Sequence, residues 1–269
     1  MACLVKPLSV SFIYPVAMVD ASSVEPIGAT FVSQLVASPT TVLQLKSVNE
    51  DSMKKIAIIL SGCGVFDGSE IHESVLTLLH VELNGGQYQC FAPDIQQHHV
   101  IDHFKQQPSD ESRNVLVESA RIARGDIQDL AQLNVDQFDA LILPGGFGAA
   151  KNLTNFAEQG AQSYVLDQVL HICKAFADAN KPVGYACIAP VIIPRVYPAG
   201  VKLTIGNDAD TAKAINEMGG QHVNCNVDQV VVDERYQVVS TPAYMLAENI
   251  AQANRSIGKL VEQVMALTN

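Results

Sequence analysis

Short apolar runs alternate with longer segments of mixed polarity from about residue 53 to the end of the chain. The runs at 54–60, 138–144 and 182–186 are largely apolar, which is typical of strands buried on both faces of a sheet. Weaker strand patterns occur elsewhere, and two of them are close enough in sequence to form a hairpin. These further strands are predicted at 87–94, 202–205, 227–233 and 236–241.

The segments between the strands carry apolar residues at helical spacing. In the segment 71–83 they form one stripe, the pattern of a helix that packs against a core. The stripe consists of Ile71, Val75, Leu78, Leu79 and Leu83. An Asn-Gly-Gly sequence then ends this helix. Further helices are predicted at 112–125, 163–180, 208–218 and 245–267.

Strands that alternate with helices of this length imply parallel pairing through right-handed crossovers. The sequence therefore predicts an α/β fold with a flavodoxin-like, doubly wound, mostly parallel sheet and helices on both faces. In such sheets ligands bind outside the carboxyl ends of the strands. The connections expected at that edge are 61–70, 92–99, 144–151, the turn at Cys187 and 240–245.

The first 52 residues differ from the rest, because residues 1–49 contain two lysines, no arginine and no clear helical or strand period. We predict a poorly ordered N-terminal extension over 1–52 and a single domain over 53–269. A secretory signal around the apolar stretch 8–19 and a structured arm are alternatives. A mitochondrial transit peptide is disfavoured, because such peptides are rich in arginine.

Composition excludes several classes of protein. The net charge is −11 with a pI near 5.0, so a nucleic-acid surface is not expected. No apolar stretch is long enough to cross a membrane. The six cysteines are scattered without the spacing of a zinc site, which predicts a reducing compartment and a cytoplasmic protein with no metal and no cofactor.

Cys187 lies between a predicted strand and the segment that follows it, at a strand-to-helix turn. The N-terminus of a helix stabilises a thiolate, so we expect the pKa of this thiol to be lowered. The backbone N–H groups of Gly146 or Phe147, and of Ile188, are candidate oxyanion and substrate-binding donors. The alternative is a buried thiol that only packs.

Several motifs together resemble one known family. SGCGVFDGSEIHE, PGGFGAAKNL, NKPVGYACIAP and TPAYM are similar to motifs of the ElbB family, also called enhancing lycopene biosynthesis proteins. That family belongs to the class I glutamine amidotransferase-like superfamily, which also contains the PfpI proteases. The resemblance covers residues 53–269. It implies that Cys187 is a nucleophile and that Glu70, from the loop after the first strand, approaches it.

The chain departs from the superfamily at the residues that would activate the cysteine. Ile188 stands where PfpI-type sites have a histidine, and Thr241-Pro242-Ala243 stands where glutamine amidotransferases have His-x-Glu. Hydrolysis by a triad is therefore not expected. One of His98, His99 and His103 is an alternative source of a base.

A cysteine and a carboxyl without histidine suit proton transfer better than acyl hydrolysis. The resemblance implies a glyoxalase III-like lyase that needs no glutathione. Cys187 would add to the aldehyde of glyoxal or methylglyoxal, and Glu70 would move a proton between its two carbons. The alternative is a non-catalytic redox-sensing or scaffold protein that affects isoprenoid metabolism. We expect a homodimer whose ligand is a small aldehyde.

Overall fold

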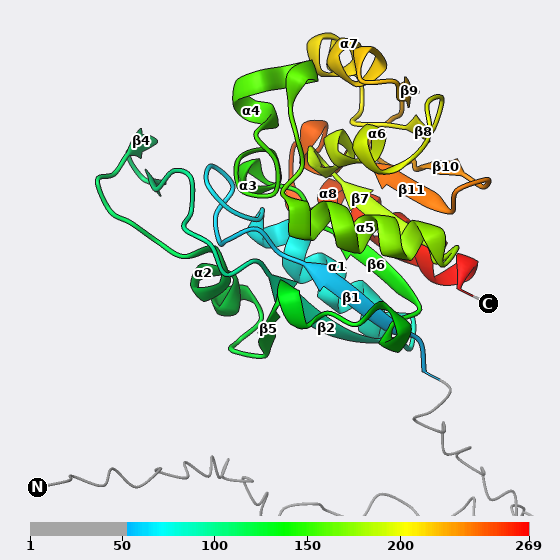
Figure 1. The fold of residues 1–269 in the computed structure, drawn as a ribbon, viewed down its shortest axis with the longest axis horizontal. Helices are drawn as coiled ribbons and strands as arrows, with labels where there is room; N and C mark the ends of the chain where they lie inside the picture. Colours follow the sequence, from blue (N-terminus) through cyan, green and yellow to red (C-terminus); the bar gives the residue numbers. More distant parts are fainter. Residues whose placement is uncertain (1–52, 269) are drawn as a thin grey trace, which may run out of the picture. The chain divides into compact units, whose positions relative to one another are not determined.

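The structure, a computed structural model, describes residues 53–268. The predicted extension 1–52 lies outside the described residues. A seven-stranded sheet forms the centre, in the order β10-β11-β7-β6-β1-β2-β5 (Figure 1). Every neighbouring pair is parallel except β10 and β11, which form the predicted hairpin. The strands are β1 (Lys55–Ile59), β2 (Gln87–Ala92), β5 (Ile127–Asp129), β6 (Ala140–Leu143), β7 (Val183–Ala186), β10 (Val231–Asp233) and β11 (Val238–Thr241).

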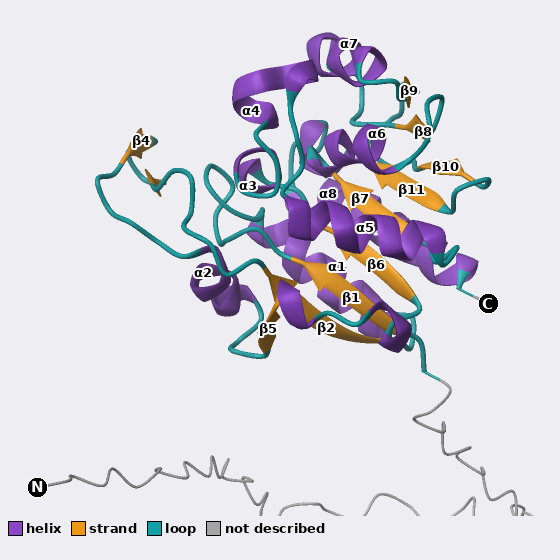
Figure 2. Cartoon of the chain, in the orientation of Figure 1, coloured by secondary structure: helices purple, strands orange, loops and turns teal. Residues whose placement is uncertain are grey.

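Helices cover both faces of this sheet, which confirms the predicted fold class (Figure 2). Two short pairs of strands lie outside the main sheet: β3 (Ile101–Asp102) with β4 (Gln107–Pro108), and β8 (Lys202–Leu203) with β9 (Gln221–His222). No helix among residues 53–268 is both long enough and apolar enough to cross a bilayer. The helices are α1 (Ile71–Leu83), α2 (Val115–Ile122), α3 (Phe147–Lys151), α4 (Phe156–Gln159), α5 (Asp167–Asp178), α6 (Ile193–Val196), α7 (Ala209–Glu217) and α8 (Ile250–Leu267).

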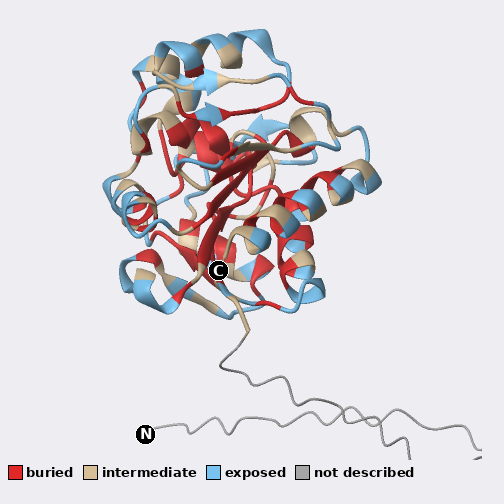
Figure 3. Cartoon of the chain, turned by 90° about the vertical axis from the view of Figure 1, so that its right-hand side faces the viewer, coloured by how far each residue is buried: buried red, intermediate tan, exposed pale blue. Residues whose placement is uncertain are grey.

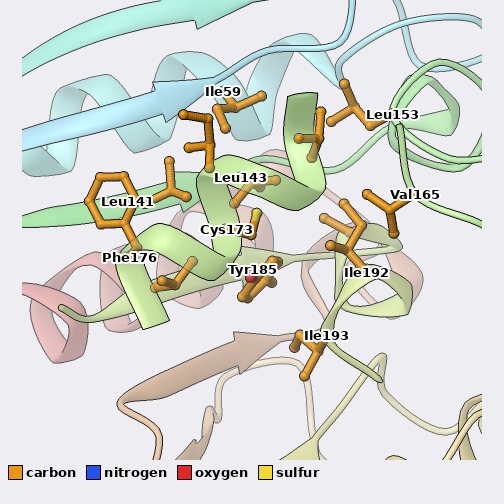
Figure 4. Packing of buried hydrophobic residues seen from close by; sticks show 14 of the residues in the cluster. Ile59, Leu141, Leu143, Leu153, Val165, Cys173, Phe176, Tyr185, Ile192 and Ile193 are labelled. Atoms are coloured by element: carbon orange, nitrogen blue, oxygen red, sulfur yellow. The ribbon is translucent and has the colours of Figure 1, made fainter. Parts of the chain in front are cut away.

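The core consists of two apolar layers separated by the sheet, whose strands β6, β7 and β11 are buried throughout their length (Figure 3). Successive side chains of a strand point to opposite faces, so β1 serves both layers. Ile59 packs toward α5, where Phe176 meets Leu141 (Figure 4). Ile58 packs on the other side, in the layer that includes Leu260 of α8. This arrangement explains why the strand runs carry no polar alternation.

Helix α1 does not bury the stripe that its sequence predicts. Of that stripe only Leu78 is buried. Ile71, Val75, Leu79 and Leu83 are 42%, 47%, 42% and 68% exposed. The buried face carries Glu73, Ser74 and Thr77 together with Leu76, Leu78 and Val81. The two hydroxyls donate to the carbonyls four residues earlier, at 2.7 Å each, so their burial leaves no donor unpaired. The predicted stripe is therefore wrong as the buried face of α1, because the inward side mixes three polar residues with three apolar ones.

Candidate active site

Cys187 lies directly after β7, in the middle of the sheet. Its φ is 58°, in the left-handed region that residues with a side chain rarely adopt. Its N–H donates to the carbonyl of Thr241 at 3.0 Å, and a 3-10 turn over Ala189–Ile192 follows. This is the strained strand-to-helix turn expected of a nucleophile elbow.

The backbone N–H groups of Gly146 and Ile188 lie near the sulfur of Cys187 and favour its thiolate form. Gly146 has a φ of 95°, and a Cβ there would clash with the backbone of Gly68 and Glu70, so this position requires glycine. The N–H of Phe147 donates instead to the carbonyl of Val65 at 2.8 Å. The expectation that Phe147 could supply a backbone donor is therefore wrong, although its side chain lines the adjacent cavity.

The carboxyl that contacts the thiol belongs to Glu73. The thiol and this carboxyl adjoin each other, and each shifts the pKa of the other. The side chain of Glu73 is fully buried, and both of its oxygens accept backbone N–H groups. Oε2 accepts from Gly145 at 2.9 Å and Oε1 from Tyr244 at 3.0 Å. These bonds hold the carboxyl between the loop after β6 and the segment after β11.

Glu70 was expected at this place, and its position has a local cause. It is the N-cap of α1, where its Oε2 accepts from the N–H of Glu73 at 2.7 Å. A cap of this kind satisfies one of the free donors of the first helical turn. The prediction that Glu70 contacts the thiol is thus wrong, because Glu73, one turn further on, takes that place. Glu70 lines the same cavity as Cys187.

Burial governs the ionisation of this pair. It raises the pKa of Glu73 to about 8, and the nearby charge of Glu70 adds to the increase. Burial also raises the pKa of the Cys187 thiol, as does the charge of Glu73, against the opposing effect of the N–H groups of Gly146 and Ile188. The predicted lowering of this pKa is wrong. The two groups form one coupled acid pair that holds its protons at neutral pH.

A cavity of about 400 Å³ opens above the sulfur. Its walls come from the loop 61–70, α3, α4, the elbow, the start of α7 and the segment after β11. The hydroxyl of Tyr244 lies 2.8 Å from Nδ1 of His72. His72 is not part of the cavity lining, so it orients the Tyr244 side chain from outside the cavity. Sequence reasoning missed both Glu73 and Tyr244. The Glu-x-x-Glu spacing at 70–73 was the available signal for Glu73.

The three candidate histidines of the loop after β2 do not line the cavity. Nε2 of His98 lies 2.9 Å from a carboxylate oxygen of Glu158. His99 stacks beside His98, and Nε2 of His103 accepts from the N–H of Phe66 at 3.3 Å. The alternative that one of them supplies a base to Cys187 therefore has no support. Within residues 53–268 no group of three or more histidine, cysteine or acidic side chains is arranged to hold a metal.

Gly145 controls the spacing between thiol and carboxyl. A Cβ there would lie 2.7 Å from Oε2 of Glu73 and would clash with the Cβ of Cys187. We expect Gly145→Ala to lower the free energy of unfolding by about 1–3 kcal/mol, as overpacking does. It should also shift the pH profile of Cys187 alkylation, because the pair is pushed apart. Urea unfolding and mass spectrometry of the alkylated peptide measure the two effects.

Gly85→Ala is the matched control, since nothing lies within 4 Å of its added Cβ. Its φ of 75° makes a side chain strained, so it should lose about 1 kcal/mol and leave the alkylation profile unchanged. An unchanged profile in Gly145→Ala as well would contradict the role given to this glycine.

No protein-family model matches the chain. It is 47% identical over 224 residues to the human "Glutamine amidotransferase-like class 1 domain-containing protein 3, mitochondrial", covering 80% of this chain and 83% of that protein. It resembles the crystal structure of an isoprenoid biosynthesis protein with an amidotransferase-like domain from Ehrlichia chaffeensis. The TM-score is 0.76 and the identity 38%, over 80% of this chain and all of the other.

A likeness to glyoxalase III from Candida albicans concerns the fold alone. The TM-score is 0.53 at 14% identity, over 81% of this chain and 98% of the other. The human relative and the ES1 proteins of rat and zebrafish are named mitochondrial, which contradicts the prediction of a cytoplasmic protein. Scattered free cysteines indicate only a reducing environment, and several compartments provide one. The homodimer stays a prediction.

Proposed function

This chain belongs to the family of glutamine amidotransferase-like class 1 domain proteins that includes the ES1 proteins, and on that premise we propose that it is a glyoxalase-type enzyme independent of glutathione. One observation carries the proposal: a buried thiol paired with a buried carboxyl, beside a cavity that a second carboxyl lines. The position of a triad histidine is taken by Thr241-Pro242-Ala243. The chemistry is therefore proton transfer.

In the first step the sulfur of Cys187 forms a bond to the aldehyde carbon of a 2-oxoaldehyde. Glu73, in the fraction of molecules in which it is ionised near its pKa of about 8, takes the thiol proton and passes it to the former aldehyde oxygen, so the product is a hemithioacetal. The N–H groups of Gly146 and Ile188 adjoin the sulfur and are the donors available to that oxygen as charge develops on it. The raised pKa of Glu73 suits it to exchange a proton near neutral pH.

In the second step a carboxylate removes the hydrogen from the carbon bonded to sulfur and returns it to the neighbouring carbon through an enediol. We assign this to Glu70, because its side chain faces the cavity while that of Glu73 is fully buried. The former aldehyde carbon is oxidised to a thioester as the ketone is reduced to an alcohol, so no external oxidant is needed. Water then cleaves the thioester, releasing a 2-hydroxy acid and the free thiol.

The test is the formation of a 2-hydroxy acid from methylglyoxal by the full-length protein without glutathione. We expect turnover in the unmodified protein and turnover at the uncatalysed level in Cys187→Ala, because no sulfur is left to form the hemithioacetal. Cys63→Ala is the matched control, since that thiol is partly exposed and lies outside the cavity. Equal product formation in Cys187→Ala and the unmodified protein would refute the proposal.

The alternative of a redox-sensing protein requires a thiol that ionises readily and is open to solvent. Cys187 is 8% exposed and its pKa is raised, so both properties weigh against sensing. Peroxide-dependent oxidation of Cys187 in a protein without any turnover would reverse this preference.

A further inference from the structure

The cavity above Cys187 is larger than its proposed reaction requires. Methylglyoxal is a three-carbon compound, whereas the cavity measures about 400 Å³. Pockets of about 300–1,000 Å³ hold ligands of drug size. A three-carbon aldehyde bound at the sulfur would leave most of this space to water. The volume therefore points to a substrate with a larger body attached to the reacting carbons.

The walls of the cavity are mostly apolar. Beyond the elbow, its surface is formed chiefly by Val65, Phe147, Ala150, Phe156, Ala157 and Met245. These residues come from three separate parts of the chain: the loop after β1, α3 with α4, and the turn after β11. An apolar chain or ring placed against them would be removed from water, and burial of this kind contributes about 0.8 kcal/mol per CH₂ group.

The charges at the cavity are all negative. Glu70 and Asp208 line it, and no lysine, arginine or histidine among the described residues does so. Hydrogen bonds from Thr211 lower the pKa of Asp208, which keeps this carboxylate ionised. Lys151 is not part of the cavity lining: its Nζ lies 5.2 Å from the centroid of the Phe147 ring and donates to the carbonyl of Phe66 at 2.9 Å. A substrate with a carboxylate or phosphate would meet repulsion and no compensating cation.

We propose that the substrate is an uncharged 2-oxoaldehyde whose reacting carbons carry an apolar ring or chain, and that anionic analogues are rejected at Asp208. This inference rests on the proposed function for its reacting group. The apolar body lies against Phe147, Phe156 and Met245, and the aldehyde carbon lies at the sulfur.

Turnover of three 2-oxoaldehydes by the full-length protein tests the substrate class. Phenylglyoxal is uncharged with an apolar ring, methylglyoxal lacks the ring, and 4-carboxyphenylglyoxal adds a negative charge. We expect kcat/KM for phenylglyoxal to exceed that for methylglyoxal at least about tenfold, from burial of the ring. The carboxylated compound should fall below phenylglyoxal by about tenfold or more. Equal values for the three compounds, or a preference for the anion, would overturn the inference.

Two substitutions locate the effect in the cavity. Asp208→Asn keeps the N-cap of α7, because asparagine caps as well as aspartate, and should raise the carboxylated-to-neutral ratio of kcat/KM. Asp210→Asn removes a charge of the same helix outside the cavity lining and should change that ratio much less.

Ala157→Phe, on the exposed side of α4, should reduce the phenylglyoxal-to-methylglyoxal ratio of kcat/KM, because the larger side chain fills the apolar part of the cavity. Ratios that stay constant in both cavity variants would contradict the assignment.

A binding measurement separates this inference from the proposed function. Acetophenone resembles phenylglyoxal but lacks the aldehyde, and benzoate has similar size with a negative charge. We expect acetophenone to slow the alkylation of Cys187 by iodoacetamide and benzoate to leave it unchanged. Protection by acetophenone alone supports the inference even if no aldehyde is turned over. Equal protection by both, or by neither, would count against it even if methylglyoxal is turned over.

Discussion

Glu73→Gln is expected to remove most of the change in stability between pH 5 and pH 8. The pKa of Glu73 is raised from 4.5 to about 8 in the folded protein. The folded state therefore binds more protons than the unfolded chain in this window, so its stability is full below pH 4.5 and declines as the pH rises toward 8. The shift corresponds to a decline of up to about 5 kcal/mol. Glutamine does not titrate, so the variant should lack this slope.

The slope, rather than the stability at one pH, is the informative quantity. Glutamine has one oxygen where Glu73 has two, so the N–H of Gly145 or Tyr244 loses its acceptor at every pH. That loss costs about 1–3 kcal/mol, independent of pH. Urea unfolding at a series of pH values separates the two effects. Glu82→Gln, on the exposed surface of the same helix, should keep the slope of the unmodified protein.

The same substitution should lower the pKa of the Cys187 thiol. The negative charge of Glu73 contributes to the increase in that pKa, and it is absent from the variant. Alkylation of Cys187 by iodoacetamide, followed across pH, should show a midpoint at lower pH than in the unmodified protein. An unchanged midpoint would mean that burial alone sets the ionisation of the thiol.

Glu70→Gln is expected to reduce turnover of 2-oxoaldehydes by roughly a hundredfold or more, the contribution typical of a general base. The substitution keeps a side-chain carbonyl that can accept from the N–H of Glu73, so the cap of α1 should persist. Alkylation of Cys187 should remain, because the thiol contacts Glu73. Steady-state kinetics together with alkylation rates measure both properties.

Glu82→Gln is the control for this variant too, because it removes a carboxylate of α1 outside the cavity. Normal turnover in Glu70→Gln would show that the proton between the two carbons is moved by another group. Conversion of the 2-oxoaldehyde would then depend on Cys187 and Glu73 without Glu70.

Much of the fold was predictable because its strands are buried on both faces. Continuous apolar runs identified β1, β6 and β7, and the order of elements identified a parallel sheet. Ligands bind at the carboxyl edge of a parallel sheet. From this rule the sequence predicted that the loop 61–70, the loop after β6 and Cys187 lie at the same edge. The positive φ of Cys187 follows from the same topology.

Two of the errors, the acidic partner of Cys187 and the buried face of α1, concern burial around one helix. An apolar stripe normally marks the inward face, but α1 faces the site with Glu73, and this polar face is stabilised by contacts from distant segments. Gly145 and Tyr244 lie 72 and 171 residues from Glu73 in sequence, so no local sequence pattern predicts these contacts. The pKa of Cys187 was misjudged for the same reason. The turn after it is only a short 3-10 segment, and desolvation outweighs its donors.

The hydrogen bond from the N–H of Cys187 to the carbonyl of Thr241 joins the reactive residue to a neighbouring central strand. An amide at this position exchanges its hydrogen with solvent only when the sheet itself opens. The backbone of Cys187 therefore belongs to the slowest-exchanging part of the molecule, while its sulfur faces a cavity that ligands can enter. We therefore expect small alkylating reagents to reach the thiol through that cavity without local unfolding of the elbow.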